Sequence, residues 1–384
     1  MRIRVFWSEY QTGPNQYDQG VVNRIVSQVQ AARGWSPYAF DPKALVEFEL
    51  PNEIVPWMQQ AGYSLTQGEG QGASRYYPAS IAGAEAYGRA MAKLLKTLYD
   101  VQIAHAIETP NEPNLINATA QAVPAEHVGR LGAFGLTYAA AEGVPVTSPG
   151  GPVVLVGAVN TDPNSAHGSE GTSPAQYFDV VQTSANYWLE WWWKGLPNGV
   201  GHAEWLMGFW RASFHSYPKL GVGEGFSCQR METPQGAKLQ DEAGDLTGQA
   251  AYNEVAQRLA PVLSVLTGPK GKGRKWWITE TGMTSYKTNV VNETYQACIN
   301  RRVAGGSAYG KAEQRNFYSS LAFNVDWNRL YGSYPWNSVE GVAFFMPNDF
   351  PMAPNDPFKG FGAFMPGCGN YCWKPAAEYF ANNL

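Results

Sequence analysis

Short apolar runs alternate with longer segments of helical periodicity along almost the whole chain. The clearest helical segment covers residues 81–98, where Met91, Leu94 and Leu98 recur on one side at spacings of three to four residues. Strands that alternate with helices pair in parallel, because each crossover helix returns the chain to the same end of the sheet. The sequence therefore predicts an α/β fold, a single (β/α)8 TIM barrel over residues 1–384.

The candidate strands are short and rich in Val, Ile, Phe and Trp. In order they cover residues 3–7, either 37–40 or 45–50, 63–66, 103–107, 144–147, 209–214, 276–279 and 339–345. The candidate helices cover residues 17–32, 51–61, 81–98, 125–142, 176–193, 247–266, 312–330 and 374–382. Long segments rich in Gly, Pro and Asn follow strands five to eight, at 148–175, 218–246, 282–310 and 346–372. These segments are expected on the face of the barrel where the strands end.

Two of these strands end in glutamates, one in each half of the chain. The run at 103–107 is stopped by two prolines, which lack the N–H that a sheet needs, and Asn111 and Glu112 lie in the turn between them. Glu280 directly follows the run at 276–279. Parallel barrels build their active sites at these strand ends. Two carboxylates there suit the cleavage of a sugar bond, which needs one acid and one nucleophile or base.

Three motifs follow one another along the chain. They are Thr-Pro-Asn-Glu-Pro-Asn at 109–114, Ser-Pro-Gly-Gly-Pro at 148–152 and His-Ser-Tyr at 215–217. With the later glutamate, they resemble the clan A glycoside hydrolases, which are (β/α)8 retaining glycosidases, and are most similar to family 39 and its relatives. The resemblance spans nearly the whole chain. It implies a hydrolase that acts on a polysaccharide or glycoconjugate by double displacement with two glutamates.

The resemblance assigns roles to five residues. It implies that Glu112 is the acid/base, that Asn111 hydrogen-bonds the 2-hydroxyl of the sugar, and that Glu280 is the nucleophile. Tyr217 would hydrogen-bond Glu280 and favour its charged form, and His215 would lie on the rim near the substrate or the acid/base. In the retaining geometry the two carboxyl groups lie roughly 5–5.5 Å apart. Their pKa values must differ, with that of the acid raised and the nucleophile kept ionised.

Other carboxylates compete with this pair. Glu108 has the same strand parity as Glu112 but lies four residues earlier, so it is expected deeper in the barrel as a buried partner. Glu9 follows the first strand and could face the site. Glu47 and Glu49 alternate with apolar residues, which predicts that they face solvent.

The aromatic part of the site departs from the clan pattern. Clan A enzymes usually carry a Trp at the end of strand eight, where this chain reads Ala-Phe-Phe-Met. Phe345 is the expected substitute, and Trp336 or Trp373 could instead reach in from a loop. Trp276 and Trp277 open strand seven, where one should point into the barrel and one outward. Trp277 is taken as a substrate contact.

The strand count has an alternative. In the complete count, residues 3–7 are strand one and Glu112 ends strand four, as in clan A. In the other, residues 2–7 and the helix after them resemble the second βα unit of family 39, so that strand one is missing. We prefer the complete count.

Charge and cysteine content limit the classes of binding partner and metal site that we expect for this chain. The net charge is −4, so no nucleic-acid surface is implied, and no apolar run is long enough to span a membrane. Cys368 and Cys372 lie in a Gly-rich loop and could be bridged, whereas Cys228 and Cys298 fall in predicted loops and no zinc motif occurs. No metal or cofactor is expected. The N-terminus lacks a signal peptide's apolar region, so export by another route, a trimmed chain or a place in a larger particle all remain open; the expected location is extracellular or particle-associated.

A second function remains open. A barrel that binds a glycan without cleaving it, such as a receptor-recognition module of a phage tail, would carry the same long loops and aromatic residues. The presence of both Glu112 and Glu280 favours the enzyme. Sugar identity, linkage, endo or exo action and oligomeric state are left open by the sequence.

Overall fold

The computed structural model describes residues 1–344 except 36–42, 71, 117–120, 164–172, 195–197, 219–246, 272, 284–293 and 305. The chain forms two compact units. The first consists of Met1–His215, Ala260–Thr279 and Ser338–Gly341. The second consists of Ser216–Leu259 and Glu280–Asn337 and resumes at Val342. The expectation of a single domain stays a prediction.

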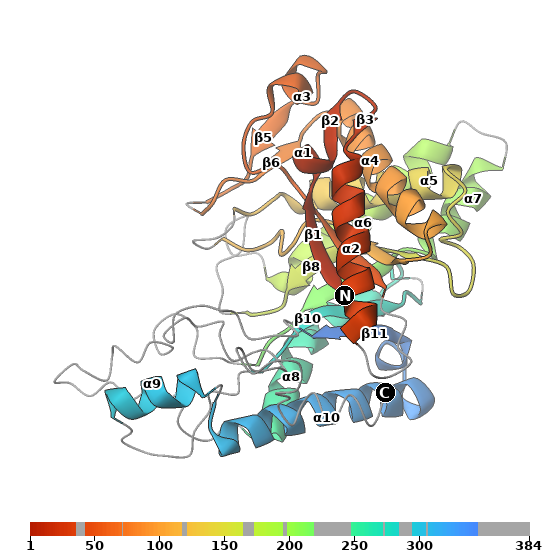
Figure 1. Ribbon diagram of the computed structural model, residues 1–384. Coiled ribbons are helices and arrows are strands. Elements are labelled where there is room, and N and C mark those ends of the chain that lie inside the picture. Colours follow the sequence, from red (N-terminus) through yellow and green to blue (C-terminus); the bar gives the residue numbers. More distant parts are fainter. Residues whose placement is uncertain are drawn as a thin grey trace. The chain divides into compact units, whose positions relative to one another are not determined.

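Seven strands of the described residues form one sheet (Figure 1). Its order is β1 (Arg2–Phe6), β4 (Ala44–Glu49), β7 (Ala104–Glu108), β8 (Val153–Asn160), β9 (Arg211–His215), β10 (Trp276–Thr281) and β11 (Val339–Phe344). The pairings from β1 through to β9 are parallel. The predicted α/β class and parallel sheet are therefore confirmed, and closure of an eight-stranded barrel stays a prediction.

Helices connect the strands, and two small ribbons are added. The helices are α1 (Trp7–Tyr10), α2 (Gln19–Trp35), α3 (Pro56–Gln60), α4 (Ile81–Asp100), α5 (Ala125–Ala141), α6 (Pro174–Trp193), α7 (Gly199–Met207), α8 (Gly248–Leu266), α9 (Tyr295–Val303), α10 (Ala308–Tyr331) and the 3-10 turn η2 (Trp336–Ser338). The ribbons pair β2 (Gln11–Gly13) with β3 (Gln16–Tyr17), and β5 (Leu65–Gln67) with β6 (Tyr76–Pro78). None of the described helices has the length and apolar character needed to cross a membrane.

Helix α5 packs unusually closely in the first unit because it carries three glycines. A Cβ at Gly129 would lie 2.3 Å from the backbone of α6, and one at Gly135 would lie 2.6 Å from the sulfur of Met91 in α4. A Cβ at Gly132 would lie 2.6 Å from the side chain of Val156 in β8. The glycines thus let α5 lie directly against two helices and the strand that leads to the functional site.

We expect Gly132→Ala to lower the free energy of unfolding by about 1–3 kcal/mol, because the added methyl group overpacks Val156. Gly201 in α7 is the matched control, since a Cβ there meets no atom within 4 Å. Gly201→Ala should instead raise stability by about 1 kcal/mol, the difference in helix propensity. Urea denaturation of both variants measures the two effects. Equal stability of the two variants would contradict the close packing of α5.

Strand five was predicted wrongly. Residues 144–147 form no strand, with 146–147 in a turn, and the strand is β8 (Val153–Asn160). The physical reason is that the prolines and glycines of 145–151 turn the chain, as in the hydrogen bond from Gly151 N–H to the Ser148 carbonyl. The continuous apolar run after them is typical of a parallel strand buried on both faces.

The complete strand count is also wrong within the described residues. Residues 63–66 were expected to be strand three, but β5 (Leu65–Gln67) belongs to a separate antiparallel ribbon. Strand two is β4 (Ala44–Glu49), which agrees with the alternative at 45–50, while 37–40 lies outside the described residues. β7, which leads to Glu112, is therefore third in the sheet. This agrees with the alternative strand count, in which strand one of the barrel is missing and β1 takes the second position.

Cys298 is buried and disulfide-bonded. The other three cysteines, Cys228, Cys368 and Cys372, lie outside the described residues. The disulfide pairing, including a possible bridge between Cys368 and Cys372, therefore stays open.

Candidate active site

Glu112 lies in a tight turn directly after β7, with a left-handed backbone conformation at φ +40°. Such a conformation costs on the order of 1–3 kcal/mol for a residue with a side chain, so the surroundings must hold it. Its carbonyl accepts hydrogen bonds from Leu115 N–H (3.1 Å) and from a guanidinium N–H of Arg75 (3.4 Å). The turn is thus fixed from two sides.

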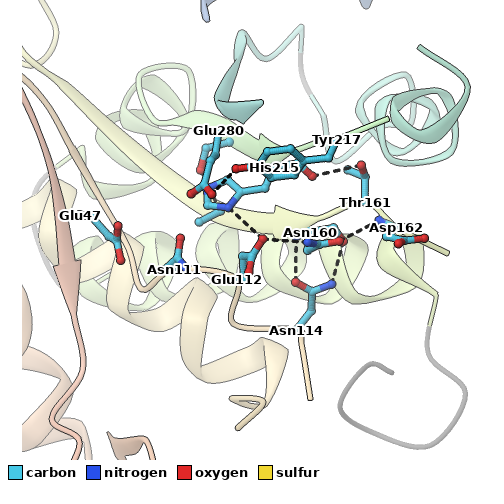
Figure 2. A network of polar contacts seen from close by, with 12 residues as sticks. Glu47, Asn111, Glu112, Asn114, Asn160, Thr161, Asp162, His215, Tyr217 and Glu280 are labelled. Carbon is cyan, nitrogen blue, oxygen red and sulfur yellow. Dashed lines mark hydrogen bonds and ion pairs between the residues drawn. The ribbon is translucent and has the colours of Figure 1, made fainter. Parts of the chain in front are cut away.

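The Glu112 carboxylate is held by two donors, both on Oε1 (Figure 2). Asn160 Nδ2 at the end of β8 donates at 2.7 Å. His215 Nδ1 at the end of β9 lies at 3.3 Å. The Glu112 side chain is 19% exposed, so solvent reaches it. Three neighbouring strands therefore bring Glu112, Asn160 and His215 together, as the parallel sheet predicts for strand ends.

Arg2 contacts the ring nitrogen of His215 that faces away from Glu112. Its Nη2 lies 3.1 Å from His215 Nε2. A guanidinium only donates hydrogen bonds, so a hydrogen bond between these two nitrogens requires Nε2 as the acceptor and the ring proton on Nδ1. Nδ1 is then the ring nitrogen that donates to Glu112. It is fully buried rather than on the rim where it was expected, and its expected proximity to Glu112 is confirmed.

The pKa of Glu112 is lowered from its ordinary value. Burial opposes ionisation, but it is outweighed by the hydrogen bond and the charge interaction with His215, the hydrogen bond from Asn160 and the positive charge of Arg2. The expectation of a raised pKa for the acid is wrong for this arrangement. The neighbours stabilise the carboxylate, which is the form that acts as a base.

Arg2 also orients Asn111. Its Nη2 donates to Asn111 Oδ1 at 2.7 Å and to Glu108 Oε2 at 3.2 Å, and it forms an ion pair with Glu47 at 3.2 Å. Because Arg2 occupies Oδ1, the Nδ2 group of Asn111 is oriented the other way. Glu108 is fully buried, as its position deep in the sheet predicts.

Glu47 and Glu49 do not face solvent, which corrects the prediction. Their exposed fractions are 2% and 4%, because β4 is buried along its whole length. Glu47 is paired with Arg4 at 2.5 Å. Glu49 is paired with Arg75 and accepts the N–H of Asn111 at 3.3 Å, so it helps to hold the turn that carries Glu112. Burial raises the pKa of Glu49, and Arg75 opposes that rise.

Glu9 was a further candidate for the site. It pairs with Arg24 of α2 at 2.5 Å, and both side chains are partly exposed. This is an ordinary surface ion pair.

Glu280 and Tyr217 form a pair of their own in the second unit. Glu280 lies near the end of β10, and the Tyr217 hydroxyl donates to its Oε1 (Figure 2). Ser216 N–H also donates to the Glu280 carbonyl at 3.0 Å. Glu280 is 7% exposed. The expected hydrogen bond between Tyr217 and Glu280 is present.

The two tryptophans of β10 both serve in packing. The Trp276 ring lies 6.3 Å from that of Phe214, and the Trp277 ring lies 5.1 Å from that of His105. Trp277 is 6% exposed, so its predicted substrate contact has no support in its surroundings here and stays a prediction. Phe345 and Trp373 lie outside the described residues.

Sequence reasoning missed four residues of the Glu112 network, namely Arg2, Arg75, Asn114 and Asn160. A signal for Arg2 was available. Arg2 and Arg4 alternate within an apolar strand, and the neighbouring strand carries Glu47 and Glu49 in the same alternation, with Arg4 opposite Glu47. Charges at matching positions on two apolar strands indicate buried pairs rather than solvent-facing residues.

Comparison with known proteins gives a fold but no close relative. No family model and no curated protein sequence matches the chain. Among solved structures, a family 39 glycoside hydrolase from Bacteroides cellulosilyticus matches over 99% of this chain and 56% of its own, with 13% identity and a TM-score of 0.50. The chain thus spans little more than half of that structure.

Two other solved structures match over more of their own length. A GH5_18 protein from Bifidobacterium longum, solved in complex with Manβ1-4GlcNAc, matches over 99% of this chain and 68% of its own, with 13% identity and a TM-score of 0.51. An endo-β-1,4-glucanase from Xanthomonas axonopodis matches over 99% and 84%, with 11% identity and a TM-score of 0.50. At such identity the likeness concerns the fold, and by its fold the chain resembles the clan A glycoside hydrolases.

Proposed function

We propose that this protein is a retaining glycoside hydrolase in which Glu112 is the acid/base and Glu280 is the nucleophile. One observation carries the proposal: two glutamates, one in the turn after β7 and one near the end of β10 in the same sheet, are each held by hydrogen-bond donors suited to a carboxylate. His215 and Asn160 hold Glu112, and Tyr217 holds Glu280. The fold shared with glycoside hydrolases of families 39 and 5 supports it.

In the first step, Glu280 attacks the anomeric carbon as the bond from that carbon to the leaving oxygen breaks. Glu112, in its protonated form, gives its proton to the leaving oxygen. A covalent glycosyl-enzyme results, with the sugar esterified to Glu280. Asn111 would donate from Nδ2 to the 2-hydroxyl, since Arg2 occupies its Oδ1.

In the second step, Glu112 acts as a base. It takes a proton from a water molecule, whose oxygen attacks the anomeric carbon and releases Glu280. Two inversions give net retention of configuration. The lowered pKa of Glu112 favours the carboxylate, which is the form needed in this second step. It also limits the first step, because that step needs the protonated form.

That limit predicts a pH dependence. Glu112 must be protonated to act as an acid, and its pKa lies below the ordinary value, so the protonated fraction is lost at lower pH than for an unperturbed glutamate. We expect kcat/KM for substrates with poor leaving groups to fall as the pH rises through this lowered pKa. Activated aryl glycosides, which need no protonation, should lack this limb. A limb at neutral pH shared by both substrate types would contradict the assignment.

A polysaccharide screen with product analysis tests the proposed activity. β-Linked glucans and mannose-containing glycans come first, because those chemistries occur among the structures with this fold. We expect soluble sugars from at least one polymer with wild type and none with Glu280→Gln. A wild-type chain that binds a glycan but releases no product, unaltered by Glu280→Gln, would instead support the glycan-binding barrel.

A further inference from the structure

Asn160 is the closest partner of the Glu112 carboxylate, at 2.7 Å from Oε1. The orientation of its amide follows from the other end. Asn160 Oδ1 accepts the N–H of Asp162 at 2.9 Å, so the nitrogen must face Glu112. Asn160 therefore donates to Glu112 and cannot act as its acceptor.

Asn114, two residues after Glu112, holds the backbone of Asn160 on both sides (Figure 2). Asn160 N–H donates to Asn114 Oδ1 at 2.9 Å, and Asn114 Nδ2 donates to the Asn160 carbonyl at 2.9 Å. The Asn114 side chain is fully buried. The turn that carries Glu112 thus also fixes the residue that contacts the Glu112 carboxylate.

A bulge in β8 aims Asn160 at the site. Between Val156 and Val159 the strand advances three residues while β9 advances two, so β8 carries one extra residue. Gly157 and Ala158 there have φ values of +125° and +44°. Because side chains alternate between the faces of a sheet, one extra residue moves every later side chain to the other face. Without the bulge, Asn160 would point away from Glu112.

The bulge is itself tied down. Gly157 N–H donates to Thr109 Oγ1 at 3.1 Å, and Ala158 N–H donates to Ser213 Oγ at 2.8 Å. Thr109 begins the turn that carries Glu112. The bulge, the turn and Asn160 are therefore one hydrogen-bonded assembly across β7, β8 and β9.

Both donors to Glu112 use the same oxygen. Asn160 and His215 each approach Oε1, and two acceptor positions on that oxygen are thereby filled. A proton added to Glu112 must then reside on Oε2. We propose that Asn160 is a positioning residue that, with His215, reserves Oε1 as an acceptor and makes Oε2 the oxygen that gives and takes the catalytic proton.

The catalytic consequence rests on the proposed glycosidase function, whereas the contact itself does not. Charged or titratable groups surround this turn on several elements. They are Arg2 and Arg4 on β1, Glu47 and Glu49 on β4, Arg75 before β6, Glu108 on β7 and His215 on β9. Arg2, Arg4 and Arg75 each pair with a buried carboxylate of this group. Asn160 is a neutral donor, so its replacement by alanine changes no charge in the group.

Titration of the Glu112 carboxyl by 13C NMR, with the signal assigned by its loss in Glu112→Gln, tests this directly. Asn160→Ala removes a donor to the charged form, so the pKa of Glu112 should rise by about one pH unit relative to wild type. Asn160→Asp is nearly isosteric and places a second carboxylate at the same distance, so the pair should share a proton and the apparent pKa should rise further. Asn23→Ala, at an exposed position of α2, is the control and should leave the pKa of Glu112 unchanged.

The pH dependence of kcat/KM distinguishes a positioning role of Asn160 from a merely structural one. For a substrate with a poor leaving group, the alkaline limb of kcat/KM should shift upward with the pKa in both variants, while a packing defect would lower the rate equally at all pH values. A pKa of Glu112 that is the same in wild type and in a folded Asn160→Asp variant overturns the inference, even if the enzyme is active. A wild-type protein that cleaves no glycoside overturns the proposed function. The order of the Glu112 pKa values in the NMR titration then still tests the contact between Asn160 and Glu112.

Discussion

Glu280→Gln should lower turnover by on the order of a thousandfold or more while leaving the fold and glycan binding nearly intact. Glutamine is close to isosteric with glutamate and can still accept the Tyr217 hydrogen bond through its amide oxygen, so packing should survive. It cannot form the covalent glycosyl-enzyme, so the two-step route is lost. Steady-state kinetics and circular dichroism measure the two properties.

Glu112→Ala should behave differently, because in the proposed mechanism it removes the proton donor and not the nucleophile. Substrates with poor leaving groups should lose the most rate, whereas activated aryl glycosides should still form the intermediate. Added azide should then restore turnover, since a small anion can attack the anomeric carbon without help from a base. Azide should give no such rescue in Glu280→Gln.

Glu142→Gln is the matched control, since Glu142 is exposed at the end of α5. It should match wild type with every substrate. The assignment of roles fails if Glu112→Ala and Glu280→Gln lose rate equally on substrates of good and poor leaving groups.

Arg2→Met should lower the free energy of unfolding by about 3–5 kcal/mol, the usual cost of leaving buried charges without their partner. Arg2 is 17% exposed and pairs with Glu47 and Glu108, which are 3% and 0% exposed. The variant also removes the donor to Asn111 and to His215 Nε2. Chemical denaturation measures the loss.

Two further variants sharpen this prediction. Adding Glu108→Gln to Arg2→Met removes one of the stranded charges and should recover part of the stability. Arg24→Met breaks only the partly exposed pair with Glu9 and should cost about 0–1 kcal/mol. Similar losses for Arg2→Met and Arg24→Met would mean that the Arg2 cluster does not support the site.

The sequence was sufficient for the elements whose pattern is local. The helix predicted at 125–142 is α5 (Ala125–Ala141), and that at 81–98 is α4 (Ile81–Asp100). Their apolar spacing, and for α4 the cap that Ser80 provides, lie within one stretch of chain. The same holds for β9 and β10, which are short β-prone runs between turn residues.

The elements that were missed depend on partners far away in the chain. The sequence of β8 is an apolar run after a loop, and its pairing with β7 and β9 makes it, rather than residues 144–147, the strand that follows β7 in the sheet. Glu47 and Glu49 alternate like exposed residues, and only Arg4 and Arg75 make their burial possible. Pairing of this kind is a property of the folded sheet.

In the candidate site, too, residues in local motifs could be predicted, whereas a residue placed by distant pairing could not. Glu112, His215, Tyr217 and Glu280 could be named from motifs at strand ends, because their chemistry is recorded in short stretches of sequence. Asn160 could not, because its direction depends on one extra residue in β8 that no periodicity reveals.

Trapping the covalent intermediate tests the central claim most directly. A 2-deoxy-2-fluoro glycoside with a good leaving group slows the second step more than the first, so the glycosyl-enzyme accumulates. Trypsin releases residues 276–287 as one peptide, between Lys275 and Lys287, and Glu280 is its one carboxylate side chain. The account predicts that mass spectrometry finds this peptide, and no other, heavier by one fluorosugar, and unmodified in Glu280→Gln. A label on another peptide, or an active enzyme that yields the inverted anomer and no adduct, would contradict it.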